Sequence, residues 1–270
     1  CALPGRVSPS LFALSCVFRA NAMPVGAVAR IVSEPDPLIW RTLTHSVDEA
    51  RAKANYSNVI HVGMDETASR RGQTYVSLFV DLNERKVLFA TPGKDSSTVA
   101  AFAADLTAHG GNTATVTEVS ADLSKAFAKG IAENLPNAKI TFDKFHVVSL
   151  VNDAVDQVRR LEQKESPTLA KSRYVWLKNP ENLTEGQWET FERLDIVNSH
   201  LKTARAYQIR LTFQDLFNQP PEHAKAFLDK WYFWATHCRL PPIIKVAKTI
   251  RKHRDGILRW FTSKINNGIL

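Results

Sequence analysis

The chain has 270 residues, of which 44% are hydrophobic and 23% are charged. This length and composition allow a large buried core in one or two domains, and they exclude a disordered protein. No apolar stretch reaches the roughly 20 residues of a bilayer span, so we expect a cytoplasmic protein with no membrane partner. Residues 1–21 contain neither Met nor a convincing signal-peptide pattern, and we expect them to be an unstructured or truncated remnant.

The net charge of +8 is concentrated at one end of the chain. Residues 241–270 contain seven basic and one acidic side chain, so this segment alone contributes +6. A localised basic stripe indicates a polyanionic partner, although the solvated face of an ordinary helix has the same composition.

Residues 22–55 show apolar positions at helical spacing on both sides of the segment SEPDP, residues 33–37. Two short helices around a tight turn are typical of a helix-turn-helix DNA-binding segment. Its second helix, residues 38–47, is then the candidate recognition helix, with Arg41 and Thr42 as DNA contacts. A plain helical hairpin remains the alternative, because the glycine expected in such turns is absent.

Residues 56–150 alternate between strand and helix patterns. Strands are predicted near 58–65, 74–82, 86–91, 113–122 and 138–147, and helices near 96–111 and 123–136. This order predicts an α/β fold with a mixed sheet, in which three antiparallel strands are followed by two crossover units. The ribonuclease H-like fold is one well-populated solution, although other α/β domains share parts of this order.

Residues 151–270 contain no further strand pattern, which predicts an all-α insertion after the sheet. The segment IIKVAKTIRKHRDGILRWF, residues 243–261, is expected to form a helix with an apolar and a basic face. Its candidate phosphate contacts are Lys245, Lys248, Arg251, Lys252 and Arg254. Trp260 follows the apolar face, so we expect it in the core rather than stacked on an unpaired base.

Two aspartates are predicted at the ends of strands that are neighbours in a ribonuclease H-like sheet. Asp65 ends the first strand and Asp122 ends the fourth, so their carboxylates would meet at one sheet edge. Two such groups repel each other unless a cation lies between them, and Mg²⁺ or Mn²⁺ suits oxygen ligands. Divalent ions held there can promote attack on a phosphodiester. The alternative is that both aspartates are polar residues of ordinary turns.

Several ordered motifs resemble those of the DDE transposases of bacterial insertion sequences, specifically the ISL-three family. They include GMDETASRRGQTYVSLFVDL, ADLSKAF, LPNAKITFDKFHVV, RLPPIIKVAKTIRKHRDGILRWF and NNGIL. The resemblance implies a ribonuclease H-like catalytic core over residues 56–150 and an upstream helix-turn-helix. It further implies a nucleoid-associated homo-oligomer on double-stranded DNA, namely the terminal inverted repeats and the target, with metal-dependent cleavage and strand transfer.

The resemblance assigns the catalytic residues one at a time. Asp65 in GMDE matches the first acid and Asp122 in ADLSKAF matches the second, so both are expected to bind the metal ion. The third acid of the family, a glutamate, directly follows an NGxL motif, and here NGIL, residues 267–270, is the end of the sequence. We therefore expect this chain to be inactive, with at most feeble strand transfer. The alternatives are a DNA-binding remnant, another ribonuclease H-like nuclease, or a poorly folding chain.

Other polar residues lie close to these aspartates in the sequence. Arg70 and Arg71 could guide the scissile strand or could be exposed turn residues. Glu66 is expected to point away from Asp65, because side chains alternate along a strand. Asp143 could reach the metal through water or serve as a structural hydrogen-bond acceptor, and His146 is expected to be packed or to face DNA.

Overall fold

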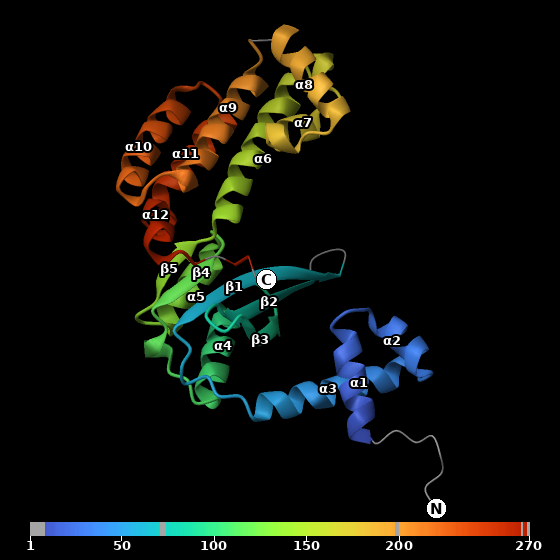
Figure 1. Cartoon of the computed structure of the whole chain (residues 1–270). Helices are drawn as coiled ribbons and strands as arrows, with labels where there is room; N and C mark the ends of the chain where they lie inside the picture. The colour runs from blue at the N-terminus through green and yellow to red at the C-terminus, as the bar shows by residue number, and fades with distance from the viewer. Residues whose placement is uncertain (1–8, 71–73, 198–199, 266, 269–270) are drawn as a thin grey trace, which may run out of the picture. The chain divides into compact units, whose positions relative to one another are not determined.

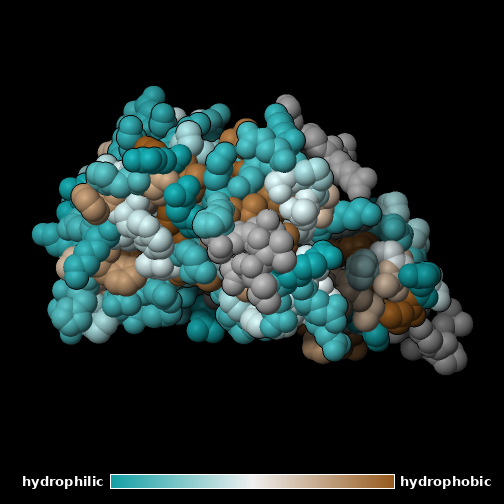
Figure 2. Space-filling view, turned by 90° about the horizontal axis from the view of Figure 1, so that it is seen from above, coloured by the Kyte–Doolittle hydropathy of each residue, from teal (hydrophilic) through white to brown (hydrophobic). Residues whose placement is uncertain are grey.

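The computed structural model describes residues 9–70, 74–197, 200–265 and 267–268 (Figure 1). The chain divides into two compact units, one formed by Cys1–Asn58 with His109–Gly111 and the other by Val59–Ala108 with Asn112–Leu270. Within the described ranges, no helix is long and apolar enough to cross a membrane. Figure 2 shows that hydrophilic side chains cover most of the face that it presents.

The smaller unit contains the helices α1 (Pro9–Ala20), α2 (Val25–Val32) and α3 (Asp36–Ala52). They pack around the buried side chains of Cys16, Val28 and Ile39, one from each helix. The prediction that residues 1–21 are unstructured is wrong for residues 9–20, because Cys16 completes a small core that α2 and α3 cannot close alone. Helices α2 and α3 are the pair predicted on either side of the turn at residues 33–35.

The larger unit contains a five-stranded sheet in the order β3-β2-β1-β4-β5. The strands are β1 (His61–Arg70), β2 (Thr74–Asp81), β3 (Lys86–Pro92), β4 (Glu118–Ala121) and β5 (Lys139–Phe142). The first three are antiparallel, whereas β4 is parallel to both β1 and β5. The predicted mixed sheet is therefore confirmed, and this α/β arrangement is compatible with a ribonuclease H-like fold.

Strand β1 is longer than the sequence predicted. Its pairing with β2 continues from Asp65, opposite Leu78, to Arg70, so the expectation that Asp65 ends the strand is wrong. The apolar pattern stops at Asp65 because the following residues are polar, but backbone pairing with β2 does not require apolar side chains. On its other side β1 pairs with β4 only as far as Gly63. Asp65 therefore lies on a rigid strand that has lost one of its two neighbours.

Helix α4 (Ser96–Ala108) packs with β3, and α5 (Lys125–Asn134) packs with α4. Phe79 of β2 stacks on Phe102 of α4, with ring centroids 4.5 Å apart. Gly130 allows α5 to approach α4 closely, since a Cβ atom there would lie 2.8 Å from Val99. This packing fixes the β4–α5 turn in which Asp122 lies.

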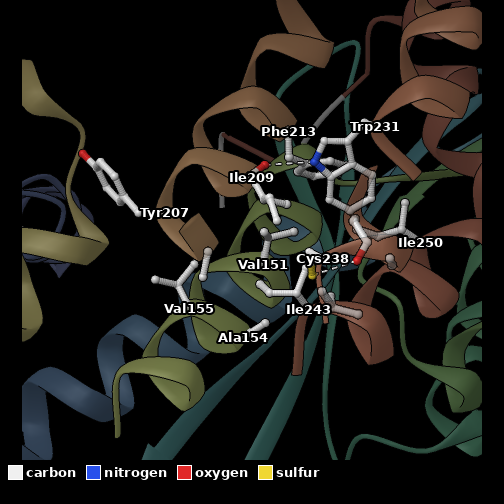
Figure 3. Packing of buried hydrophobic residues seen from close by; sticks show 14 of the residues in the cluster. Val151, Ala154, Val155, Tyr207, Ile209, Phe213, Trp231, Cys238, Ile243 and Ile250 are labelled. Atoms are coloured by element: carbon white, nitrogen blue, oxygen red, sulfur yellow. Dashed lines mark hydrogen bonds between the residues drawn. The ribbon is translucent and has the colours of Figure 1, made fainter. Parts of the chain in front are cut away.

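The helical region of the larger unit follows β5. It consists of α6 (Lys144–Glu162), α7 (Arg173–Leu177), α8 (Glu185–Val197), α9 (Lys202–Gln214), α10 (Pro221–His237) and α11 (Pro241–Lys252), with 3₁₀ turns between some of them. Its core brings side chains from α6, α9, α10 and α11 together (Figure 3). There Trp231 packs on Phe213 and donates a 2.9 Å hydrogen bond to the Ile209 carbonyl.

The last helix, α12 (Arg254–Ser263), lies beside β5 rather than continuing α11 (Figure 1). The prediction of one helix across residues 243–261 is wrong at His253, whose ring packs edge-on against Phe142. Gly256 permits the contact with the sheet, because a Cβ atom there would lie 2.6 Å from the Phe142 ring. Residues 254–263 thus pack on the sheet, and Ile257 and Phe261 also belong to the hydrophobic core of the helical region.

Candidate active site

The register of the sheet places Asp65 and Asp122 at neighbouring positions. Strand β4 is paired with β1 from His61, opposite Glu118, to Gly63, opposite Ser120. Extending this register by two residues sets Asp122, the first residue after β4, beside Asp65. Neighbouring strands are about 4.8 Å apart. The two aspartates therefore lie near one edge of the sheet, and the charge of Asp65 raises the pKa of Asp122.

Each aspartate uses one carboxylate oxygen to accept a hydrogen bond from a nearby backbone amide. Asp65 Oδ1 accepts a hydrogen bond from the Glu66 amide at 2.8 Å, and Asp122 Oδ1 accepts one from the Ser124 amide at 2.9 Å. In the described part of the chain, the second oxygen of neither group accepts a hydrogen bond. Both carboxylates are therefore held in place with one oxygen left for an external partner.

A cleft of about 480 Å³ opens at this edge of the sheet. Its titratable wall residues are Glu66, Lys94, Asp122 and His146, and the first turns of α6 close one side. Glu66 thus lines the same cleft as Asp122, although strand alternation had given it little weight. Asp65 is not among the residues that line the cleft, whereas Glu66, the next residue of β1, is.

The carboxylates of the cleft destabilise one another's charged forms. Burial raises the pKa of Asp122; the Ser124 amide and the charge of His146 lower it, and the charge of Asp65 raises it further. Burial also raises the pKa of Glu66, as do the charges of Asp122 and Asp65, against the opposing effect of Lys94. Among the described residues, no ion pair neutralises any of the three acids. The cleft therefore favours an added cation.

The donor set fits a hard divalent cation. Carboxylate oxygens are the ligands that Mg²⁺ and Mn²⁺ prefer, and Mg²⁺ typically takes only one or two of them from a protein and keeps several waters. Within the described ranges, no group of three or more histidine, cysteine, aspartate or glutamate side chains is arranged to hold one ion. Asp65 and Asp122 are therefore the candidate pair, with Glu66 beside them.

Asp143 and His146 take different places around this site. Asp143 is 2% exposed and caps α6, with Oδ1 accepting from the Phe145 amide at 2.8 Å and Oδ2 from the Asn267 amide at 2.9 Å. Both oxygens are occupied, which supports the structural alternative for Asp143. His146 lines the cleft, and its Nδ1 atom is buried with no partner among the described residues.

The predicted DNA contacts in the first part of the chain differ in how far their side chains are exposed. Arg41 is exposed on α3, whereas Thr42 is partly buried and its hydroxyl donates to the Leu38 carbonyl at 2.9 Å. Arg70 is the last residue of β1, and its side chain is not described. Arg71 lies outside the described residues.

Two of the five predicted basic contacts near the end of the chain already have a partner. Arg251 and Arg254 each form a 2.6 Å salt bridge with Asp229 of α10. The remaining three are exposed on α11: Lys245, Lys248 and Lys252. Sequence spacing could not reveal Asp229, because it lies more than 20 residues upstream on another helix. Trp260 packs against Phe217 and Phe261, as a core residue would.

Known proteins can be aligned with most of this sequence. Residues 62–270 match the family model of ISL-three DDE proteins, which is described as a transposase. The transposase of insertion element IS1557 from Mycobacterium tuberculosis is 27% identical over 266 residues, which cover 86% of this chain and 59% of the relative. The transposase of IS1001 from Bordetella parapertussis is 28% identical over 279 residues, which cover 98% and 66%. The chain thus spans about three fifths to two thirds of the length of these curated relatives.

Proposed function

Because this chain belongs to the ISL-three family of DDE transposases, we propose that its larger unit contains most of the catalytic core of an insertion-sequence transposase. In this proposal it cleaves and joins the DNA of transposon ends with the help of a divalent cation. The supporting observation is that Asp65 of β1 and Asp122, the residue after β4, lie close enough for the charge of Asp65 to raise the pKa of Asp122, and that neither has an ion pair in the described part of the chain.

Asp65 and Asp122 would hold Mg²⁺ or Mn²⁺ through the carboxylate oxygens that accept no hydrogen bond in the described part of the chain. When bound, such an ion supplies a water of lowered pKa and offsets the charge of a phosphodiester. Lys94, whose Nζ lies 3.7 Å from the centre of the Tyr75 ring, adds a positive charge to the cleft wall. Lys94 and His146 would then orient the phosphate, and Glu66 would raise the negative potential that attracts the cation.

The DNA strand has a path away from this cleft. Leu150 of α6 lines both the cleft and a second hollow of about 180 Å³, whose wall between α6 and α11 includes Lys245 and Thr249. A strand leaving the metal site along α6 would therefore pass the exposed lysines of α11. Contacts of this kind add affinity that falls with salt and is independent of sequence.

Sequence recognition would belong to the smaller unit. Residues 22–55, with α2, α3 and the exposed Arg41, would read the terminal inverted repeats of the element. The proposed partner is double-stranded DNA, both transposon end and target, on which two or more copies of the protein would assemble. Catalysis itself would belong to residues 56–150.

The test is cleavage of labelled DNA that carries the inverted repeats of the element from which the chain comes, with Mg²⁺, Mn²⁺ or no metal. We expect only feeble metal-dependent nicking at the transposon end, because the third acid of the family is not part of this sequence, and its loss in Asp65→Asn and Asp122→Asn. Glu133→Gln, which changes an exposed carboxylate on α5, is the matched control and should keep full activity. Binding to this DNA without any cleavage would contradict the catalytic role, and preferential cutting of RNA or of DNA junctions would identify a different nuclease.

A further inference from the structure

Asn267 joins two parts of the acidic cleft from a distant point in the sequence. Its side chain is 5% exposed. Its backbone amide donates a 2.9 Å hydrogen bond to Asp143 Oδ2, and its side-chain Nδ2 donates a 2.7 Å bond to the Met64 carbonyl. These partners lie 124 and 203 residues upstream. One residue thus contacts both β1 and the cap of α6.

The contact on β1 lies where the sheet has lost a strand. Strand β4 pairs with β1 only through Gly63, so the next carbonyl, that of Met64, is past the end of this ladder. The side-chain amide of Asn267 supplies that carbonyl with a donor. Since a buried backbone carbonyl without a donor is costly, the bond steadies the backbone immediately before Asp65.

Gly63 makes room for this contact. A Cβ atom at residue 63 would lie 3.0 Å from Asn267 Oδ1, 2.7 Å from a methyl group of Val80 and 2.8 Å from one of Leu82. Any side chain at this position would therefore force Val80 and Leu82 to shift and would crowd Asn267 against β1. The absence of a side chain is needed here for close approach.

The second contact reaches the opposite wall of the cleft. Asp143 caps α6 through the Phe145 amide, and the same first turn bears His146, which lines the cleft. Asn267 therefore ties the strand that carries Asp65 to the helix that forms the cleft wall. Helix α12 has buried side chains of its own, Ile257 and Phe261.

We propose that Asn267 is a positioning residue, which fixes the backbone that carries Asp65 against the first turn of α6, so that the Asp65 carboxylate can bind a divalent cation together with Asp122. The inference rests on the proposed metal site at Asp65 and Asp122. Residues that orient metal ligands without touching the ion typically change metal affinity by about 10- to 100-fold when they are replaced. The same range is the expected effect of removing the Asn267 side chain.

The experiment is a Mn²⁺ titration of the full chain followed by electron paramagnetic resonance, together with hydrogen exchange in the absence of metal. Asn267→Ala, which removes the bond to Met64 and keeps the backbone bond to Asp143, should weaken Mn²⁺ binding by about 10- to 100-fold and speed exchange at the amides of residues 64–67. Gly63→Ala, which displaces the same contact while keeping Asn267, should shift both readouts in the same direction.

The matched control is Ser172→Ala. The Ser172 hydroxyl is also buried, donates to the Leu169 carbonyl at 2.6 Å and accepts from Trp176 Nε1 at 3.1 Å, but it lies in the helical region. It should lower the melting temperature without changing Mn²⁺ affinity. Unchanged Mn²⁺ affinity in Asn267→Ala, or an equal loss in Ser172→Ala, would overturn the positioning role and leave the metal site standing. Failure of the unmodified chain to bind Mn²⁺ would overturn the metal site itself, and the inference with it.

Discussion

The sheet edge and the helical region treat buried acids in opposite ways. In the helical region Asp156 is 4% exposed and contacts Arg159, Arg160 and Arg173 at distances of 2.7, 2.8 and 3.3 Å. At the sheet edge Asp122 is half-buried and lies near His146 and near the carboxylates of Asp65 and Glu66, and in the described ranges it has no ion pair.

This difference separates structural charge from functional charge. A buried acid that the fold supplies with its own cations contributes to a fixed structure. An acid that the fold holds rigidly but leaves without a cation keeps an electrostatic cost, which only an external cation can remove. The contrast therefore supports a metal site at Asp65 and Asp122 and none at Asp156, and substitutions in the two regions should have opposite effects.

The largest expected effect is on stability. Asp156→Ala leaves the buried guanidinium of Arg159 without its carboxylate, and breaking a buried pair in this way costs about 3–5 kcal/mol. Asp122→Asn keeps an oxygen for the Ser124 amide and removes the repelled charge, so metal-free stability should stay the same or rise. Urea unfolding measures both changes. A loss of similar size in the two variants would remove the distinction between the regions.

The free energy of unfolding should depend on pH in opposite ways for Asp156 and Asp122, because their pKa values are shifted in opposite directions. Burial raises the pKa of Asp156, but the hydrogen bond from Arg159 and the charges of Arg159, Arg160 and Arg173 outweigh it, so its pKa lies below the ordinary value. Its stabilisation is therefore full above the unfolded-state pKa of about 3.9 and is lost as the pH falls through the folded-state pKa. The raised pKa of Asp122 has the reverse sign, since its destabilisation at neutral pH disappears as the pH falls through that raised value.

The measurement is the free energy of unfolding from pH 7 to pH 3 for the original chain, Asp156→Asn and Asp122→Asn. The deficit of Asp156→Asn should shrink only toward the acid end of the range. Any gain in Asp122→Asn should already shrink at higher pH, where Asp122 takes up its proton. Parallel pH curves for the two variants would show that these acids do not titrate in opposite senses.

The smallest expected effects concern the proposed DNA contacts. Lys245 and Lys248 are exposed and form no ion pair in the described part of the chain, whereas Arg251 is held by Asp229. Replacing either lysine by alanine should reduce the slope of log affinity against log salt by about 1. Arg251→Ala should reduce it less, and this substitution costs only about 0.2–1 kcal/mol of stability, because its salt bridge is exposed. Equal slopes for all three variants would contradict this ranking.

The order of the elements and the neighbouring positions of Asp65 and Asp122 could be predicted, because they depend on local patterns. Apolar alternation identifies the strands, and the order of strands and crossover helices determines which of them are neighbours. The features that were missed depend on distant contacts. Strand β1 continues past Asp65 because β2 pairs with it, and the helix break at His253 accompanies a contact with Phe142.

Two sets of contacts could not be predicted from neighbouring residues in the sequence. Asp229 binds Arg251 and Arg254 from another helix, and Asn267 reaches Met64 across 203 residues. Polar residues that act only through such contacts look like ordinary surface residues in the sequence. The positions of charged residues could thus be predicted, whereas which of them neutralise one another could not.

The most direct test of the central claim is a crystal structure of the chain soaked in Mn²⁺, with anomalous scattering used to locate the ion. The account predicts an anomalous peak about 2.0–2.2 Å from carboxylate oxygens of both Asp65 and Asp122, and none beside Asp156. A well-occupied Mn²⁺ peak elsewhere, with the two aspartates unliganded, would contradict it.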